Sequence, residues 1–278
     1  LAVLGWFCSF PMVLLRCWAA ATGRDAPAGV ARFAPWVASV GAAMLLGGLL
    51  PGVGTPHTVN YAPMVAHWGY ATGLLLFFGA VAVSHLDPGL WRPGSSALLP
   101  SAGARDLPPG SIATLLRATP LVRVGSAAVL MALLAALIAA ARSSRILEME
   151  TFLETVMWGP GHLLQIANVA FAILAWALLA AIAWARPIEG RWIWIGVATS
   201  LALPLMAAAL ILVWRDPSSW LYRQGFTTLM RWGLFPAVVV ALPLGLGVAG
   251  RFRTASRCDR SAAAALVAST LLMLVGFA

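Results

Sequence analysis

Long apolar runs, repeated along the chain, constrain this sequence more than any other feature. A helix rises about 1.5 Å per residue, so about 20 apolar residues cross the hydrocarbon core of a bilayer. Backbone groups in lipid must bond to one another, which excludes isolated strands. The eight runs cover residues 1–21, 33–50, 61–86, 124–141, 151–185, 192–214, 226–248 and 262–278. We therefore expect an all-α fold, a polytopic transmembrane bundle with about eight helices in this segment.

The composition excludes two broad classes of protein. Hydrophobic residues make up 61% of the chain and charged residues 10%, whereas soluble domains carry about 25% charged residues. A soluble enzyme is therefore excluded. A nucleic-acid-binding domain is excluded as well, because the net charge of +9 comes from arginines in short loops. We expect one transmembrane domain over residues 1–278. Both ends lie inside apolar runs, so we expect a segment of a longer chain.

The arginines divide unequally between the two sets of loops that alternating spans create. One set holds Arg16, Arg24, Arg32, Arg92, Arg105, Arg117, Arg123, Arg186, Arg191, Arg251, Arg253, Arg257 and Arg260, and the other holds Arg142, Arg145, Arg215, Arg223 and Arg231. Positive residues concentrate in cytoplasmic loops. The first set is therefore predicted to be cytoplasmic, and the fifth span enters from the outer side. The loop over residues 87–123, rich in Gly, Pro and Ser, should be irregular.

The start of the fifth span is the most informative stretch of the chain. His162 follows Gly161 about one turn inside a membrane helix, where an imidazole is costly unless it has a partner. Neutral imidazole is a common ligand of copper and haem iron, but a hydrogen bond to a neighbouring helix would also satisfy it. Pro160 suits the first turn of a helix. Residues 151–160 are therefore expected to form a separate surface or re-entrant piece.

Three carboxylates lie just outside the fifth span. They are Glu148, Glu150 and Glu154. One interpretation is a solvated outer rim. The other is a path for protons or a docking surface for a cationic donor domain, in which Glu154 is the best candidate because it is nearest to His162.

The remaining histidines and the cysteines give weaker signals. We expect His57 to be solvated in an outer loop, His67 to lie in the helix core two turns into the third span, and His85 to end that span. Cys8, Cys17 and Cys258 have no metal-binding spacing, so they predict neither a metal site nor a disulfide framework.

One motif resembles a known family. Trp158-x-x-Gly161-His162 is similar to the start of helix six in subunit I of the haem-copper oxidases, and most similar to the C-type cytochrome c oxidases and nitric oxide reductases. The stretch Asn60-Tyr61-Ala62-Pro63-Met64 is similar to the opening of helix four in that family. The resemblance covers the whole segment as helices two to nine of twelve. It implies a bacterial inner membrane location, a haem whose ligands lie outside this segment, and a copper B ligand at His162.

Two departures from the family pattern bear on the metal. The family ends helix seven with a His-His pair, but this chain has Trp214, Arg215 and Asp216 there, and no histidine follows His162. The redox-active tyrosine of the family has no counterpart near Arg191. One imidazole cannot supply the three-histidine ligand field of copper B. The resemblance therefore implies an incomplete copper site, in which Trp158, Gly161 and His162 contact the cofactor.

The resemblance implies a function, and two alternatives stay open. The first hypothesis is a subunit of a respiratory oxidoreductase that passes electrons through haem to dioxygen or nitric oxide, with other membrane subunits and a cytochrome-type electron donor as partners. The second is a degenerate homologue that binds haem without copper and acts as an electron-transfer or structural subunit. The third is a transporter or membrane scaffold with no cofactor.

Overall fold

The computed structural model describes residues 9–23, 28–50, 52–57, 64–92, 107–108, 110–143, 148–236, 239, 243 and 257–277. These residues are mainly helical, which confirms the predicted all-α class. Four helices are long and apolar enough to cross a membrane: α3 (Trp68–His85), α6 (Thr119–Arg142), α7 (Met149–Trp184) and α8 (Arg191–Trp214). Helix α1 (Phe10–Thr22) and residues Phe33–Gly48 of α2 (Ala28–Gly48) are apolar but shorter. These helices are compatible with a multi-pass membrane protein.

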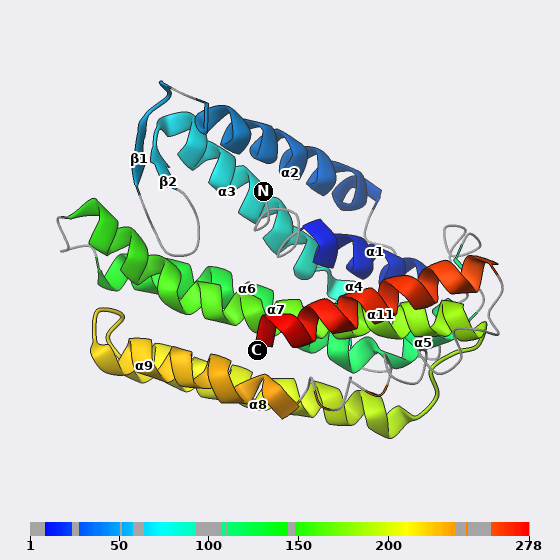
Figure 1. Ribbon diagram of the computed structural model, residues 1–278. Helices are drawn as coiled ribbons and strands as arrows, with labels where there is room; N and C mark the ends of the chain where they lie inside the picture. The colour runs from blue at the N-terminus through cyan, green and yellow to red at the C-terminus, as the bar shows by residue number, and fades with distance from the viewer. Residues whose placement is uncertain are drawn as a thin grey trace.

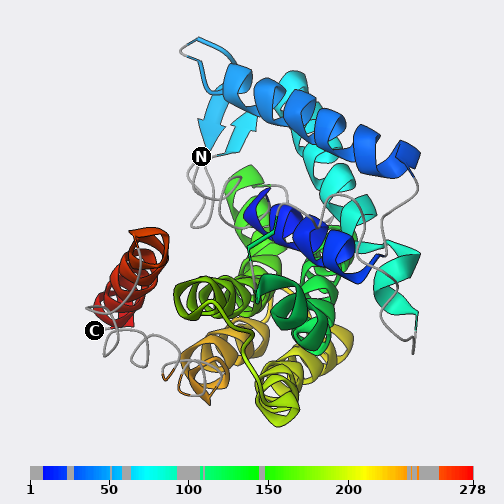
Figure 2. The same cartoon turned by 90° about the vertical axis from the view of Figure 1, so that its right-hand side faces the viewer.

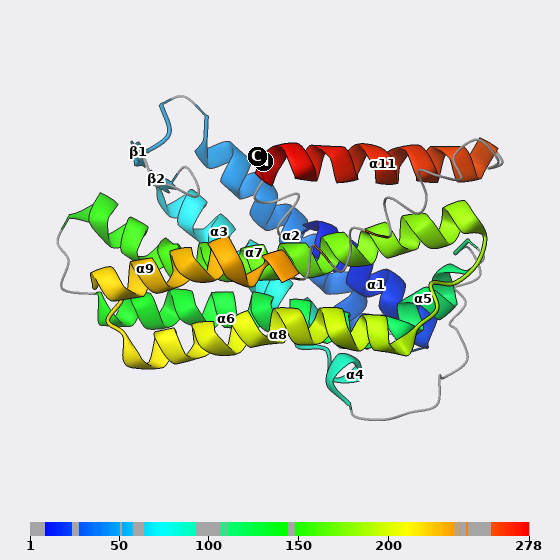
Figure 3. The same ribbon diagram turned by 60° about the horizontal axis from the view of Figure 1, so that its bottom comes forward.

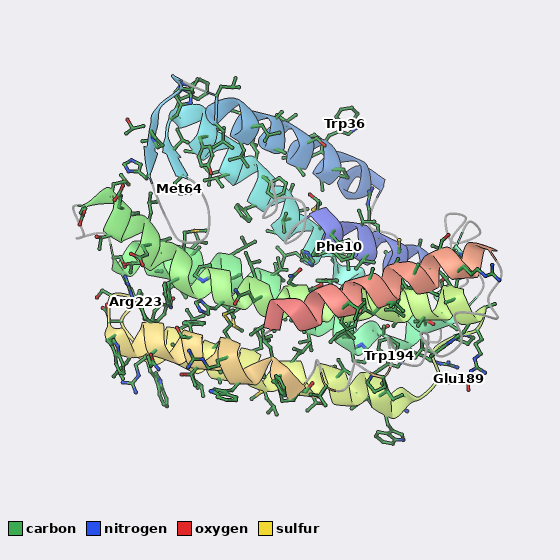
Figure 4. The ribbon with its side chains drawn as sticks, viewed as in Figure 1. Phe10, Trp36, Met64, Glu189, Trp194 and Arg223 are labelled. Atoms are coloured by element: carbon green, nitrogen blue, oxygen red, sulfur yellow. The ribbon has the colours of Figure 1, made fainter. Side chains whose placement is uncertain are left out.

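Successive long helices run in opposite directions, so their connections gather at two ends of the molecule (Figure 1). At one end, helix α5 (Ser111–Arg117) meets the connection between α7 and α8, where Arg117 donates to the carbonyl of Ile188 at 3.3 Å. At the other end, Arg142 donates to the carbonyl of Arg215 at 3.4 Å. Figure 4 places Glu189 at the first end and Arg223 towards the second. The arrangement agrees with alternating spans, while the sidedness stays a prediction.

Helices α6 and α7 pack along each other and form the centre of the core (Figure 2). Alanines recur on the facing surfaces, where a small side chain lets two backbones approach closely. The fully buried ones are Ala128, Ala132, Ala135 and Ala139 on α6, and Ala167, Ala170, Ala177, Ala180 and Ala181 on α7. Figure 2 looks nearly along these helices and shows α8 and α9 (Trp220–Thr228) beside them, with α11 (Arg257–Phe277) to one side.

Helices α2 and α3 form a separate close pair. A Cβ on Gly41 would lie 2.6 Å from the backbone nitrogen of Phe77, and one on Gly73 would lie 2.8 Å from the carbonyl oxygen of Gly41. Only glycine permits this contact of backbone with backbone, which is how helices associate in lipid. At the end of the pair where α2 ends and α3 begins, strands β1 (Thr55–His57) and β2 (Met64–Ala66) form an antiparallel hairpin.

The fifth predicted span differs from expectation at its start. We predicted a separate piece up to Pro160, but α7 is one helix from Met149 to Trp184 with Pro160 inside it. Proline removes the donor that would reach the carbonyl of Val156. Transmembrane helices tolerate that loss when neighbouring helices hold the segment, and here α9 packs against the turn that contains Gly159 and Pro160.

Three further boundaries were wrong. Residues 87–123 were expected to be irregular, but they contain α4 (Pro88–Trp91) and α5, and α6 begins at Thr119. The third span does not begin at residue 61, because β2 precedes α3, which begins at Trp68. The seventh helix begins at Trp220, six residues before 226, because the hydroxyl of Ser219 caps it by accepting from the backbone N–H of Tyr222 at 3.2 Å. It continues as the π-helical turn η3 (Leu229–Gly233). Much of its remainder lies outside the described residues.

Candidate site between helices α7 and α9

Three of the predicted site residues share one side of α7. Glu154, Trp158 and His162 follow one another at intervals of four residues, which places them one above the other along a helix. Figure 3 shows α9 lying beside the first half of this helix. The structure therefore brings together Glu154, Trp158 and His162 with side chains from α9.

His162 is buried in the bundle, with 5% of its surface exposed. Its Nδ1 lies 2.7 Å from the carbonyl oxygen of Trp158. A carbonyl only accepts hydrogen bonds, so Nδ1 carries the proton and the neutral ring has its lone pair on Nε2. Its ring lies 5.3 Å from the ring of Trp158 and 5.9 Å from that of Phe226. Nε2 is therefore the atom through which His162 could accept a hydrogen bond or ligate a metal.

Glu154 and Trp158 are tied to α9 through one residue, Arg223. The guanidinium NH1 of Arg223 lies 3.4 Å from Oε1 of Glu154, and its Cζ lies 5.4 Å from the centre of the Trp158 ring. The indole N–H of Trp158 donates to the carbonyl of Arg223 at 3.3 Å. Both charged side chains are about one-third exposed. This cluster therefore lies at the end of the site nearest the start of α7, and its ion pair remains partly solvated.

Next to this cluster, Tyr222 of α9 packs against Gly159 of α7. A Cβ added to Gly159 would overlap the hydroxyl oxygen of Tyr222 and would lie 3.0 Å from its Cζ. Tyr222 is fully buried, and its hydroxyl has no hydrogen-bond partner among the described residues. Its ring meets Phe226 edge to face at 4.9 Å. Glycines such as Gly159 and Gly161 would allow a backbone or a flat ligand to approach closely. At Gly159 the tyrosine fills that space, and Gly161 lies half-buried on the next face.

Sequence reasoning missed the three residues that α9 contributes, Tyr222, Arg223 and Phe226. All three precede or begin the predicted seventh span. The signal was present, because Asp216-Pro217 followed by Ser219 is typical of a helix start, and Tyr222 and Phe226 are separated by four residues.

The other two carboxylates, Glu148 and Glu150, are exposed, which agrees with the interpretation that they are solvated. Glu148 is exposed and accepts from the hydroxyl of Thr151 at 2.8 Å. Glu150 is exposed and lies 3.7 Å from Nδ1 of His57. The hairpin of β1 and β2 therefore contacts the start of α7, and His57 is less solvated than predicted, with 19% of its side chain exposed.

Two histidines differ from expectation. His67 is not inside a helix: it precedes α3, and its Nδ1 accepts from the backbone N–H of Gly69 at 3.2 Å. His85 ends α3 as predicted but is fully buried, with Nδ1 at 2.9 Å from the hydroxyl of Ser126 and the ring 5.9 Å from Phe171. A charge on His85 would therefore be costly.

The residues that stand in place of the family's His-His pair lie at the end of α8 and in the turn that follows it. Trp214 ends α8, and Trp214, Arg215 and Asp216 are all exposed. The carboxylate of Asp216 accepts from the hydroxyl and the backbone N–H of Ser218. The pKa of Asp216 lies below its usual range, chiefly because the Ser218 hydroxyl donates to the carboxylate and also because the Ser218 backbone N–H does so. This stretch forms the turn between α8 and α9.

Comparison with known proteins assigns no relative. Neither a family model, nor a curated protein, nor a solved structure matches this chain. The arguments for function therefore rest on the site and on the motif.

Proposed function

We propose that the chain is a subunit I-like membrane component of a haem-copper-oxidase-type complex that passes electrons through haem to a small gas such as dioxygen or nitric oxide. The observation that carries the proposal is the position of His162. It is buried in the first half of α7, its tautomer is fixed by the Trp158 carbonyl, and its ring centre lies 5.3 Å from that of Trp158 and 5.9 Å from that of Phe226. The motif around it is the one that resembles helix six of the family.

The described residues fit one wall of a haem pocket. The rings of Trp158 and Phe226 flank the imidazole, and flat aromatic surfaces suit contact with a macrocycle. Bound haem would supply one-electron chemistry. His162 would offer Nε2 towards the distal side, and Gly161 would leave space beside it. The axial ligands follow from the resemblance alone and would lie outside this segment.

Copper does not fit the donor set of this chain. Its four histidines, His57, His67, His85 and His162, lie in four different places with four different partners. Among the described residues, no three His, Cys, Asp or Glu side chains gather as metal ligands do. This dispersal favours the second candidate function, a haem-binding homologue that transfers electrons without copper B.

The surroundings of the site suggest roles for its other residues. Glu154, held by Arg223 at the outer end, would exchange protons between the aqueous phase and His162. The exposed Glu148 and Glu150 would meet a cytochrome-type donor, since rim charges steer encounter. We place the chain in a bacterial inner membrane, as about eight helices of a twelve-helix fold assembled with other membrane subunits.

The decisive experiment is spectroscopy on the full-length protein purified from membranes. We expect reduced-minus-oxidised haem bands, and a shift of these bands with carbon monoxide or nitric oxide that changes in His162→Ala. Glu189→Gln, in the connection between α7 and α8, is the matched control and should leave the bands unchanged. Absence of any haem signal would support a cofactor-free transporter or scaffold instead. Oxygen consumption with bound copper would favour a complete oxidase over the copper-free homologue.

A further inference from the structure

The polarity of α7 changes at its midpoint. The polar side chains of this helix are Glu150, Thr151, Glu154, Thr155, His162, Gln165 and Asn168. After Asn168, residues 169–184 carry only aliphatic, phenyl and indole side chains. The first half of α7 can therefore contact polar groups, whereas residues 169–184 suit only apolar surroundings.

Gln165 and Asn168 end this polar half with side-chain oxygens that lack a hydrogen-bond partner among the described residues. Both of these oxygens are buried. A buried amide group without a partner costs about 1–3 kcal/mol. Interchanging the amide oxygen and nitrogen does not remove the cost, because each end needs a partner. Two such groups less than one turn apart indicate something polar that contacts both.

These two residues continue a stripe that begins at the outer end of the helix. Trp158, Gly161, Gln165 and Asn168 follow at intervals of three, four and three residues, so they lie along one face. All four are only partly buried. On the face that packs into the core, Leu163, Ala167 and Leu174 are fully buried and apolar. The polar stripe therefore lies apart from the tightly packed side of α7.

We propose that this stripe lines a water-filled path that opens at the outer face beside Glu154 and ends at Asn168. Water satisfies buried amides in protein interiors, and Gly161 contributes no side chain to obstruct it. The fourteen steps along the helix from Glu154 to Asn168 span about 21 Å, compared with a hydrocarbon core of about 30 Å. The path carries water and hydrated protons, and the apolar residues after Asn168 close it towards the other side.

The path passes His162 and would serve the proposed electron-transfer function by supplying protons from the outer side. It does not depend on that function, because it follows from the polarity and burial of α7 alone. A protein without haem could contain the path, and a haem protein could lack it.

The test is the reactivity of single cysteines towards a charged methanethiosulfonate reagent added from the outside. The reagent reacts with the thiolate, which needs water. With Cys8, Cys17 and Cys258 replaced by serine in the full chain, Gln165→Cys and Asn168→Cys should react at least about tenfold faster than two controls. Ala172→Cys lies on the same face one turn deeper, and Ala167→Cys lies in the fully buried core.

Each outcome decides the proposal. Labelling of positions 165 and 168 at the rate of position 167 would overturn the path. Equal labelling at position 172 would overturn its closure at Asn168.

A second measurement uses the unmodified protein, in case a cysteine variant does not fold. His162 and Trp176 are almost equally buried, at 5% and 6% exposure, but only His162 borders the path. Hydroxyl radicals generated from water by synchrotron radiolysis should oxidise His162 several-fold faster than Trp176. Indole is intrinsically at least as reactive as imidazole, so equal or slower oxidation of His162 would contradict the proposal.

Discussion

Replacing Gly159 by alanine tests the packing of the site directly. The added methyl group would lie well inside 3.0 Å of the Tyr222 hydroxyl oxygen, 3.0 Å from its Cζ and 3.2 Å from Cε2 of Phe226. Overpacking of this kind costs about 1–3 kcal/mol. Alanine regains up to about 1 kcal/mol in helix propensity. We therefore expect a net loss of about 1–2 kcal/mol in the free energy of unfolding.

The Tyr222→Phe background separates this clash from other effects. The hydroxyl of Tyr222 is buried and has no partner among the described residues, so its removal should be neutral or stabilising by about 1 kcal/mol. With the oxygen gone, the methyl group of Gly159→Ala meets ring carbons at 3.0 Å and beyond. The cost of Gly159→Ala should then fall by about 1 kcal/mol or more, which is a measurable coupling energy.

The assay is reversible unfolding of the four proteins of this cycle in mixed micelles, followed by tryptophan fluorescence. Gly196→Ala on α8 is the control, because a Cβ there would meet no atom of the described residues within 4 Å, apart from its own stretch of helix; it should not destabilise the protein. Additive effects of Gly159→Ala and Tyr222→Phe, within about 0.5 kcal/mol, would refute the contact between α7 and α9.

Three other predictions follow from the same structure. A membrane-impermeant thiol reagent added outside should label Glu150→Cys but not Glu189→Cys, because the arginine distribution puts Glu189 in the cytoplasm; the reverse pattern would invert the topology. Metal analysis of the purified chain should find no stoichiometric copper that depends on His162, and one tightly bound copper lost in His162→Ala would contradict us. Asp216 has a lowered pKa because Ser218 donates to it, so its contribution to stability is present above the ordinary pKa of about 3.9 and is lost as pH falls towards the folded value. Asp216→Asn should flatten that acid limb in a pH series of unfolding midpoints, whereas an unchanged limb would show that Asp216 contributes nothing.

The sequence by itself determined the class of the protein and the position of its most informative helix. Apolar runs can be recognised without tertiary information because lipid requires about 20 apolar residues in one stretch. The same logic marks His162, since a lone imidazole in such a run needs a partner. Glu154 and Trp158 could be grouped with it from helical spacing alone.

Only the tertiary structure decided where α7 begins and what its histidine contacts. Local rules put a break at Pro160 because proline lacks an amide donor, but contacts with α9 hold the helix continuous. The partners of the site, Tyr222, Arg223 and Phe226, lie about 60 residues further along the chain, and no local pattern states which face of one helix will meet another. The sequence also could not predict that the side-chain oxygens of Gln165 and Asn168 lack hydrogen-bond partners among the described residues, because the identity of a residue does not show which groups it contacts. Hydrogen bonding depends on atoms brought together by packing, and that is decided by the tertiary fold.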